Sequence, residues 1–122
     1  MELPHLPRQA VIDAHGHGGF RFAGMSHRGS LLCLPEGIWA WPVAAITALT
    51  DEALGLVFAR AGDLDFFILG TGAEPWIVPS RIRDRFRAAH ISLDVMTTAP
   101  AVRTYNVMLM ESRRVGSGLI AV

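Results

Sequence analysis

The chain has 122 residues, 51% hydrophobic and 18% charged, which suits one domain with a sizeable core and excludes a disordered protein. Acidic and basic residues balance at 11 each, so no net charge draws the molecule to nucleic acid or to an anionic membrane. All the basic residues are arginine, and the lack of lysine excludes Schiff-base, P-loop-lysine and carbamylated-lysine chemistry.

The cysteine content and the apolar stretches indicate in which cellular compartment the protein is expected. Cys33 is the only cysteine, so neither an internal disulfide nor a cysteine cluster for zinc can form. The first ten residues lack the basic start and apolar core of a signal peptide. The most hydrophobic stretch, residues 37–49, contains Pro42 and Thr47 and is shorter than the ~20 apolar residues of a membrane-spanning helix. We therefore expect a soluble, cytoplasmic protein without a membrane span.

Residues 1–9 predict a flexible N-terminal tail. The segment contains Pro4 and Pro7, and the first residues of a domain are commonly poorly ordered. Residues 10–122 contain neither an internal repeat nor a low-complexity linker. We expect them to form a single domain.

The first half of this domain predicts short antiparallel strands. Residues 9–14 and 19–23 are apolar or alternating and flank a glycine-rich turn. Residues 30–34 and 38–41 predict a second strand pair, which turns at the Pro-Glu-Gly sequence of residues 35–37.

The second half predicts alternating helices and strands. Thr50 is suited to cap a helix that ends at Gly62. The continuous apolar run of residues 64–70 is typical of a strand covered on both faces. A helix over 79–90 and a strand over 91–96 follow it. This order predicts a βαβ unit, with parallel strands and a right-handed crossover.

A third helix and a last strand complete the predicted elements. The helix begins near residues 98–100, where a proline suits the first turn, and runs to about Ser112. The strand covers residues 115–122. The predicted fold class is α/β, with an antiparallel β portion first, a βαβ unit in the second half, and a partly parallel sheet.

Asp13, His15 and His17 match the way metal ligands open an amidohydrolase barrel. That barrel needs ~200 residues or more, and this chain cannot close one. Two interpretations then remain: a transition-metal site on a surface loop, or polar residues in a glycine-rich turn. The second is favoured, so we assign no metal and no cofactor.

A stronger binding candidate is the loop that follows the predicted strand over 64–70. Gly70, Thr71 and Gly72 lie at its carboxyl end, where open α/β sheets bind ligands. The two glycines let backbone N–H groups face an anion or a partner's carbonyl groups. The dinucleotide fingerprint fails because Pro75 and Trp76 replace its end. An ordinary tight turn between strand and helix is the alternative.

Residues 97–106 begin where the next parallel strand ends, so we expect them beside this loop. Arg103 lies within the first two turns of the third helix, and Thr97 and Thr98 offer hydroxyls near its free N–H groups. Together the two segments predict a small anion pocket. The candidate ligand-binding residues are Gly70, Thr71, Gly72, Thr97, Thr98, Arg103, Tyr105 and Asn106.

The same segment also has a structural interpretation. Thr98 can cap the helix, and Arg103 can pair with Asp94 or another acid. Tyr105 can fill the core, and Asn106 needs a hydrogen-bond partner if it is buried. Both interpretations stay open.

No other pattern assembles a catalytic site. Ser30 is not in a nucleophile elbow, and Cys33 lies in an apolar strand that suits an inert buried thiol. Trp39 and Trp41 share one side of a strand, which predicts core packing, or a docking patch if they are exposed.

The predicted helix over 79–90 carries alternating arginines. Ile82 and Phe86 define its inner face. The outer arginines are Arg81, Arg83, Arg85 and Arg87. We expect a solvated face, because zero net charge and the lack of neighbouring aromatic residues disfavour RNA binding.

Several short segments resemble a known family. They are Gly18–Arg21 (GGFR), Gly29–Leu32 (GSLL), residues 41–43 (WPV), Leu69–Gly72 (LGTG), and residues 103–109 (RTYNVML) with Glu111 and residues 113–115. Together they are similar to the small Mth-type domain of unknown function, related to the mitochondrial assembly factor of respiratory complex I (NADH:ubiquinone oxidoreductase). The resemblance covers about residues 10–122. It implies a three-layer α/β domain with a central mixed sheet.

The resemblance implies a non-enzymatic protein-binding domain that docks onto a protein partner, with respiratory-complex subunits as candidates. In a bacterium this predicts a cytoplasmic location, peripheral at the inner membrane through that partner. Catalytic residues are not established for the family, so none is transferred, and relatives often have cysteine where Val102 stands here. The alternative is a small-molecule or anion-binding domain, extending to an unrecognised enzyme, that uses the Gly70–Gly72 loop and Arg103.

Overall fold

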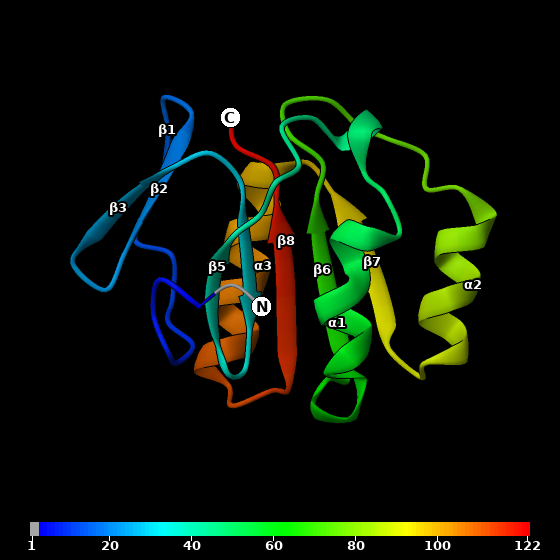
Figure 1. Ribbon diagram of the computed structural model, residues 1–122. Coiled ribbons are helices and arrows are strands. Elements are labelled where there is room, and N and C mark those ends of the chain that lie inside the picture. The colour runs from blue at the N-terminus through cyan, green and yellow to red at the C-terminus, as the bar shows by residue number, and fades with distance from the viewer. Residues whose placement is uncertain (1–2) are drawn as a thin grey trace.

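The computed structural model describes residues 3–122 and contains a central five-stranded sheet, in the order β5-β4-β8-β6-β7 (Figure 1). Its strands are β4 (Leu31–Leu34), β5 (Gly37–Ala40), β6 (Phe66–Gly70), β7 (Ser92–Met96) and β8 (Val115–Leu119). β4 is antiparallel to β5 and β8, whereas β6 is parallel to both β7 and β8. The sheet is therefore mixed, as predicted.

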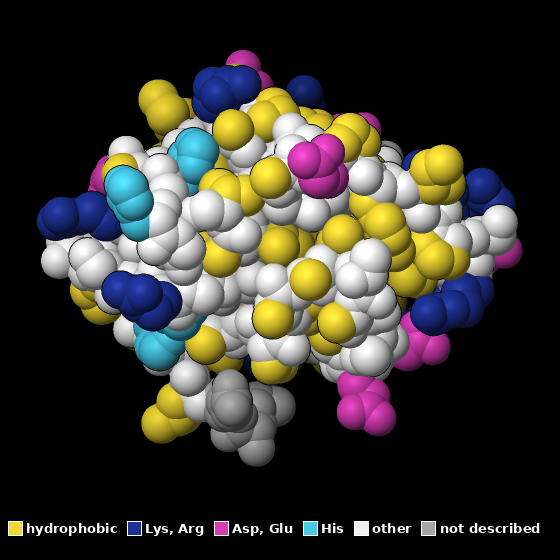
Figure 2. Space-filling view, turned by 90° about the horizontal axis from the view of Figure 1, so that it is seen from above, with side chains coloured by type: hydrophobic (Ala, Val, Ile, Leu, Met, Phe, Trp, Pro, Cys, Tyr) yellow, Lys and Arg dark blue, Asp and Glu magenta, His cyan; other side chains and the backbone are white. Residues whose placement is uncertain are grey.

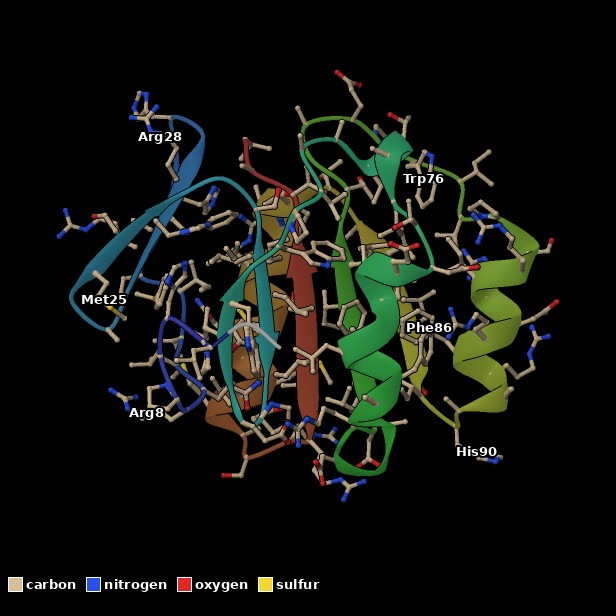
Figure 3. The ribbon with its side chains drawn as sticks, viewed as in Figure 1. Arg8, Met25, Arg28, Trp76, Phe86 and His90 are labelled. Carbon is tan, nitrogen blue, oxygen red and sulfur yellow. The ribbon has the colours of Figure 1, made fainter. Side chains whose placement is uncertain are left out.

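The predicted βαβ unit is confirmed. β6 and β7 run parallel, with Leu69 opposite Val95, and α2 (Ser80–Ala88) connects them. Ile82 and Phe86 are the buried residues of α2, and Phe86 lies between this helix and the sheet (Figure 3). The apolar spacing of the helix therefore identified its inner face correctly.

Helices cover both faces of the central sheet (Figure 1). On one face α3 (Thr98–Met110) places Val102 and Tyr105 against Ile68 of β6. On the other face Val57 of α1 (Gly55–Ala59) packs with Phe67, the next residue of β6. Alternate residues of a central strand thus enter two apolar cores, which explains its continuous apolar sequence.

The tryptophan pair belongs to the second of these cores. Trp39 and Trp41 are 7% and 4% exposed, and the indole N–H of Trp41 donates a 2.8 Å hydrogen bond to the Ala53 carbonyl. The core interpretation of the pair is confirmed.

The predicted helix from Thr50 to Gly62 is wrong in its length. The segment forms the short 3-10 helices Glu52–Leu54 and Ala61–Asp63 on either side of the five-residue α1. A third 3-10 helix, Ile46–Ala48, precedes them. Thr50 does accept a 3.2 Å hydrogen bond from the Ala53 N–H, as predicted. Glycine weakens a helix interior, and Gly55 lies where the first 3-10 turn passes into α1.

A second, three-stranded antiparallel sheet projects from one end of the molecule (Figure 1). It consists of β1 (Ala14–Gly16), β2 (Gly19–Phe22) and β3 (Met25–Arg28). The sequence analysis anticipated β2 but not β3. The predicted pair of strands around the glycine turn is present, but the first strand covers Ala14–Gly16 instead of residues 9–14. Residues 10–12 run along α3, where Asn106 binds both the N–H and the carbonyl of Ile12.

The segment before residue 10 touches the edge of the central sheet. The N–H of Ile38 in β5 donates a 3.0 Å hydrogen bond to the Leu6 carbonyl, and His5 N–H donates one of 2.8 Å to the Ile38 carbonyl. A Cβ at Gly37 would lie 2.7 Å from the Leu6 carbonyl oxygen, so this approach requires glycine. The flexible tail over 1–9 stays a prediction, and its first two residues lie outside the described residues. Among residues 3–122 no helix has the length and apolarity needed to span a membrane.

Candidate functional site

The two loops predicted to form a binding edge do lie side by side. The N–H of Thr71 donates to the Met96 carbonyl at 2.8 Å, which joins the ends of β6 and β7. The N–H of Thr98 donates to the Gly72 carbonyl at 2.9 Å, and the Gly72 N–H donates to the Thr98 hydroxyl at 2.9 Å. Because parallel strands end at one edge of a sheet, the sequence correctly predicted this meeting.

Most polar groups at this edge form hydrogen bonds with other groups of the fold. Thr98 is 0% exposed, and its hydroxyl also donates a 2.7 Å hydrogen bond to the Ile120 carbonyl. The Thr71 hydroxyl donates to the Glu74 carbonyl at 2.7 Å. A Cβ at Gly70 would lie 3.1 Å from Ala101, Leu119 and Thr98, so close packing already accounts for this glycine. The Gly72 N–H faces Thr98 rather than solvent.

Arg103 and Thr97 are less constrained. Arg103 is exposed in the second turn of α3, and within the described part of the chain it forms neither the predicted ion pair with Asp94 nor another one. Thr97 occupies the N-cap position of α3 without a side-chain cap hydrogen bond. Ligand binding by these residues stays a prediction.

Tyr105 and Asn106 fasten the N-terminal segment to α3. The Tyr105 hydroxyl donates to the Ala10 carbonyl at 2.9 Å, and the ring is 0% exposed. Burial, with a further contribution from neighbouring Cys33, raises the pKa of Tyr105. The Asn106 amide accepts from the Ile12 N–H and donates to its carbonyl, each at 2.8 Å. Asn106 has thus the partners that its place on the inner stripe of α3 requires.

Cys33 and the helix α2 have the roles expected of them. Burial raises the pKa of the Cys33 thiol to about 12, against a smaller lowering by Tyr105, so the thiolate is suppressed at neutral pH.

On α2, Arg81 lies 2.6 Å from the Asp51 carboxylate and Arg87 lies 3.0 Å from that of Asp84. Much of this arginine face is therefore neutralised by neighbouring acids.

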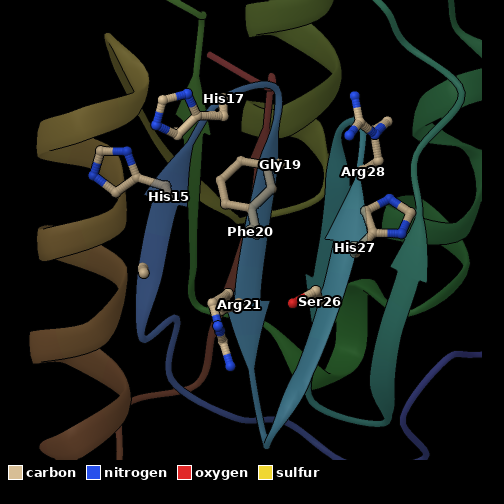
Figure 4. Close-up of a pocket in the computed structure, with 10 residues that line it drawn as sticks. His15, His17, Gly19, Phe20, Arg21, Ser26, His27 and Arg28 are labelled. Carbon is tan, nitrogen blue, oxygen red and sulfur yellow. The ribbon is translucent and has the colours of Figure 1, made fainter.

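A hollow lies on the three-stranded sheet (Figure 4). The sequence analysis weighed His15 and His17 of this region only as metal ligands or turn residues, and did not predict a binding surface here. The hollow measures about 420 Å³. Its lining residues are Ala14, His15, Gly16, His17, Gly19, Phe20, Arg21, Ser26, His27 and Arg28. The available signal was the segment Met25–Arg28 between two glycines, but a strand with a single apolar residue shows no hydrophobic alternation.

The histidines of this sheet differ in their surroundings. His15 and His17 are exposed, while His27 is half-buried, donates from Nε2 to the Ser30 carbonyl at 3.1 Å, and lies 4.9 Å from the His5 ring. Burial lowers the pKa of His27, with a smaller lowering by His5, against an opposing effect of the Ser30 hydrogen bond. Residues 3–122 contain no group of three or more His, Cys, Asp or Glu placed to hold a metal.

Comparison with known proteins gives sequence relatives along nearly the whole chain. Residues 12–120 match the family described as "Protein of unknown function (DUF498/DUF598)". An uncharacterised protein of Rhodobacter capsulatus is 38% identical over 109 residues, 89% of this chain and 82% of that protein. The mouse NADH dehydrogenase (ubiquinone) 1 alpha subcomplex assembly factor 3 is 25% identical over 94% of this chain. The chain spans 62% of that assembly factor's length.

Solved structures share the fold. A Bartonella henselae protein described as an outer membrane protein is 42% identical, with a TM-score of 0.93 over 97% of this chain and 99% of its own. A Bordetella pertussis protein described as an Mth938-like domain has a TM-score of 0.81 at 21% identity, covering 98% of this chain and 92% of its own. The fold implied by the family resemblance is thereby confirmed.

Proposed function

The chain belongs to the DUF498/DUF598 family, and from this membership we propose that it is a non-enzymatic protein-binding domain that acts in the assembly of respiratory complex I. One observation carries the proposal: the similarity to assembly factor 3 extends along 94% of this chain. The partner is then a protein, and subunits of the respiratory complex are the candidates. We place the domain in the cytoplasm, reaching the inner membrane through that partner.

The use of the reactive side chains supports binding over catalysis. The Thr98 hydroxyl holds two loops together, the Tyr105 hydroxyl holds the N-terminal segment, and the Cys33 thiol is kept protonated by burial. A general base or nucleophile needs access to its substrate and a pKa near the working pH. All three groups are buried, and burial raises the pKa of Cys33 and of Tyr105 above their ordinary values.

Deletion of the gene in the organism that encodes it, with respiratory complexes resolved on native gels, tests the proposal. We expect less fully assembled complex I and an accumulation of its subassemblies, restored by a plasmid copy of the chain. The other respiratory complexes serve as the internal control and should keep their amounts. An unchanged level of complex I contradicts the proposal.

A further inference from the structure

One face of the three-stranded sheet is built from small residues and arginines. Phe20 and Phe22 of β2 are buried in the core shared with α3, so Gly19 and Arg21, which alternate with them, face solvent. Residues directly opposite on neighbouring strands share that face, and these are Ala14, Gly16, Ser26 and Arg28. Most side chains on this face are small, which leaves the hollow above the backbone. The two arginine side chains extend from the same face.

The hollow is basic and lacks a compensating acid. Its lining residues include three histidines and two arginines but neither aspartate nor glutamate. Residues 14–35 contain no acidic residue at all. Within residues 3–122 neither Arg21 nor Arg28 forms an ion pair, although α2 shows how readily nearby arginines find carboxylates in this fold. The positive charge of this surface is thus available to a partner.

The directions of the arginines suit an extended ligand. Arg21 pairs across the strands with Ser26, and Arg28 lies two residues further along β3 on the same face. Such diagonal neighbours are about 7–8 Å apart at Cα. Figure 4 shows the Arg28 side chain pointing toward one end of the hollow and that of Arg21 toward the other. Because the two side chains diverge, their guanidinium groups lie further apart than their Cα atoms, so one small anion meets only one of them. An extended peptide with carboxylates along its length can reach both.

We propose that this hollow binds an extended acidic segment of a partner protein, whose carboxylates lie along its length and reach both Arg21 and Arg28. The inference rests on the proposed protein-binding function and specifies the chemistry of the partner. Charge-assisted hydrogen bonds between guanidinium and carboxylate give the contact its geometry.

Fluorescence anisotropy with a defined probe tests this assignment. The probe is a fluorescein-labelled peptide with glutamate at alternate positions, and its glutamine counterpart is the matched control. We expect the glutamate peptide to bind the whole chain at low ionic strength, and added salt to weaken that binding. R21Q and R28Q should each weaken it about three- to fivefold, and the double variant more than about tenfold. R83Q/R87Q removes the same charge from α2 and should change it less than about twofold.

A second variant fills the hollow instead of removing its arginines. Ser26→Glu places a carboxylate directly across from Arg21 and offers an internal competitor to the peptide. We expect binding to fall at least about tenfold, while Ser26→Gln, of similar size, retains most of it. Circular dichroism confirms that both variants stay folded, which the exposure of Ser26 favours.

Three results overturn the inference: equal binding of the glutamate and glutamine peptides, equal weakening by R83Q/R87Q, or complete displacement by low concentrations of inorganic phosphate. The last would mark a site for small anions. The peptide assay contains no respiratory complex, so its failure beside a loss of complex I in the deletion strain contradicts this inference alone. Peptide binding beside an unchanged complex I contradicts only the assembly role.

Discussion

The edge at the ends of β6 and β7 and the sheet β1–β3 use their polar residues in opposite ways. At the edge, the Thr98 hydroxyl and the Gly72 N–H satisfy each other inside the fold. On the three-stranded sheet, Arg21 and Arg28 face solvent without an ion-pair partner in the described chain. Viewed from above, histidine and arginine side chains gather over that end (Figure 2).

The difference shows that a polar residue near a glycine turn can serve either the fold or the binding of a ligand. Glycine lets two backbones approach, and the groups brought together can then bind each other as well as a ligand. A surface retains binding capacity only where charged or polar groups stay uncompensated by the fold. Substitutions at the β6–β7 edge should therefore cost stability, and substitutions in the hollow should cost binding.

The largest effect is expected for Thr98→Val. The change keeps the shape but leaves the Gly72 N–H and the Ile120 carbonyl buried without this partner. At about 1–3 kcal/mol for each unsatisfied buried group, we expect a loss of about 3 kcal/mol in the free energy of unfolding, measured by urea denaturation. Thr97→Val is the matched control and should stay within about 0.5 kcal/mol. Equal losses in the free energy of unfolding for the two variants would contradict the structural role assigned to the Thr98 hydroxyl.

Asn106→Ala comes next. It removes both hydrogen bonds to Ile12 and should cost about 2 kcal/mol. Hydrogen exchange at the Ile12 amide should accelerate more than at the β6 amides, because only the N-terminal segment is released. Val107→Ala, on the exposed side of the same helix, should cost less than about 0.5 kcal/mol. A uniform acceleration through the protein would show that Asn106 supports the whole core instead.

His27 is the exception within the three-stranded sheet, because its ring is held by the fold. Burial lowers its pKa below the unfolded value of 6.5, so the unfolded chain binds more protons in the interval between the two values. The free energy of unfolding should therefore be undiminished above about pH 6.5 and decline as the pH falls through that interval. Urea denaturation across pH 5–8 measures it, and His27→Gln, which keeps a donor for Ser30, should flatten this part of the profile. A wild-type stability that rises on acidification would contradict the sign.

The smallest effect on stability is expected for R21Q/R28Q. Neither guanidinium has an ion-pair partner in the described structure, so the double variant should stay within about 0.5 kcal/mol of the unaltered protein in urea denaturation. The same variant is expected to lose most of its affinity for the acidic peptide. A large destabilisation would show that these arginines serve the fold, and the two regions would then not differ in the way described.

Local patterns predicted most elements and missed those that depend on partners. The apolar run of β6 and the inner residues of α2 needed only periodicity. β3 escaped because Met25 is its one apolar residue, and the strand exists through pairing with β2. The helix predicted from Thr50 breaks into single turns that packing against the sheet holds in place.

The sequence by itself determined the order of strands and helices from β6 to β8, the parallel pairing of β6 and β7, and the meeting of their loops. These depend on turn residues, hydrophobic period and the handedness of the crossover, all of which act over short distances along the chain. The tertiary structure alone decided which polar groups remain free. Thr98 finds its partners 26 and 22 residues away, and Asn106 finds Ile12 at a separation of 94 residues. Hydrogen-bond satisfaction is a property of the packed molecule, and it is what separates a structural edge from a surface with charge to offer.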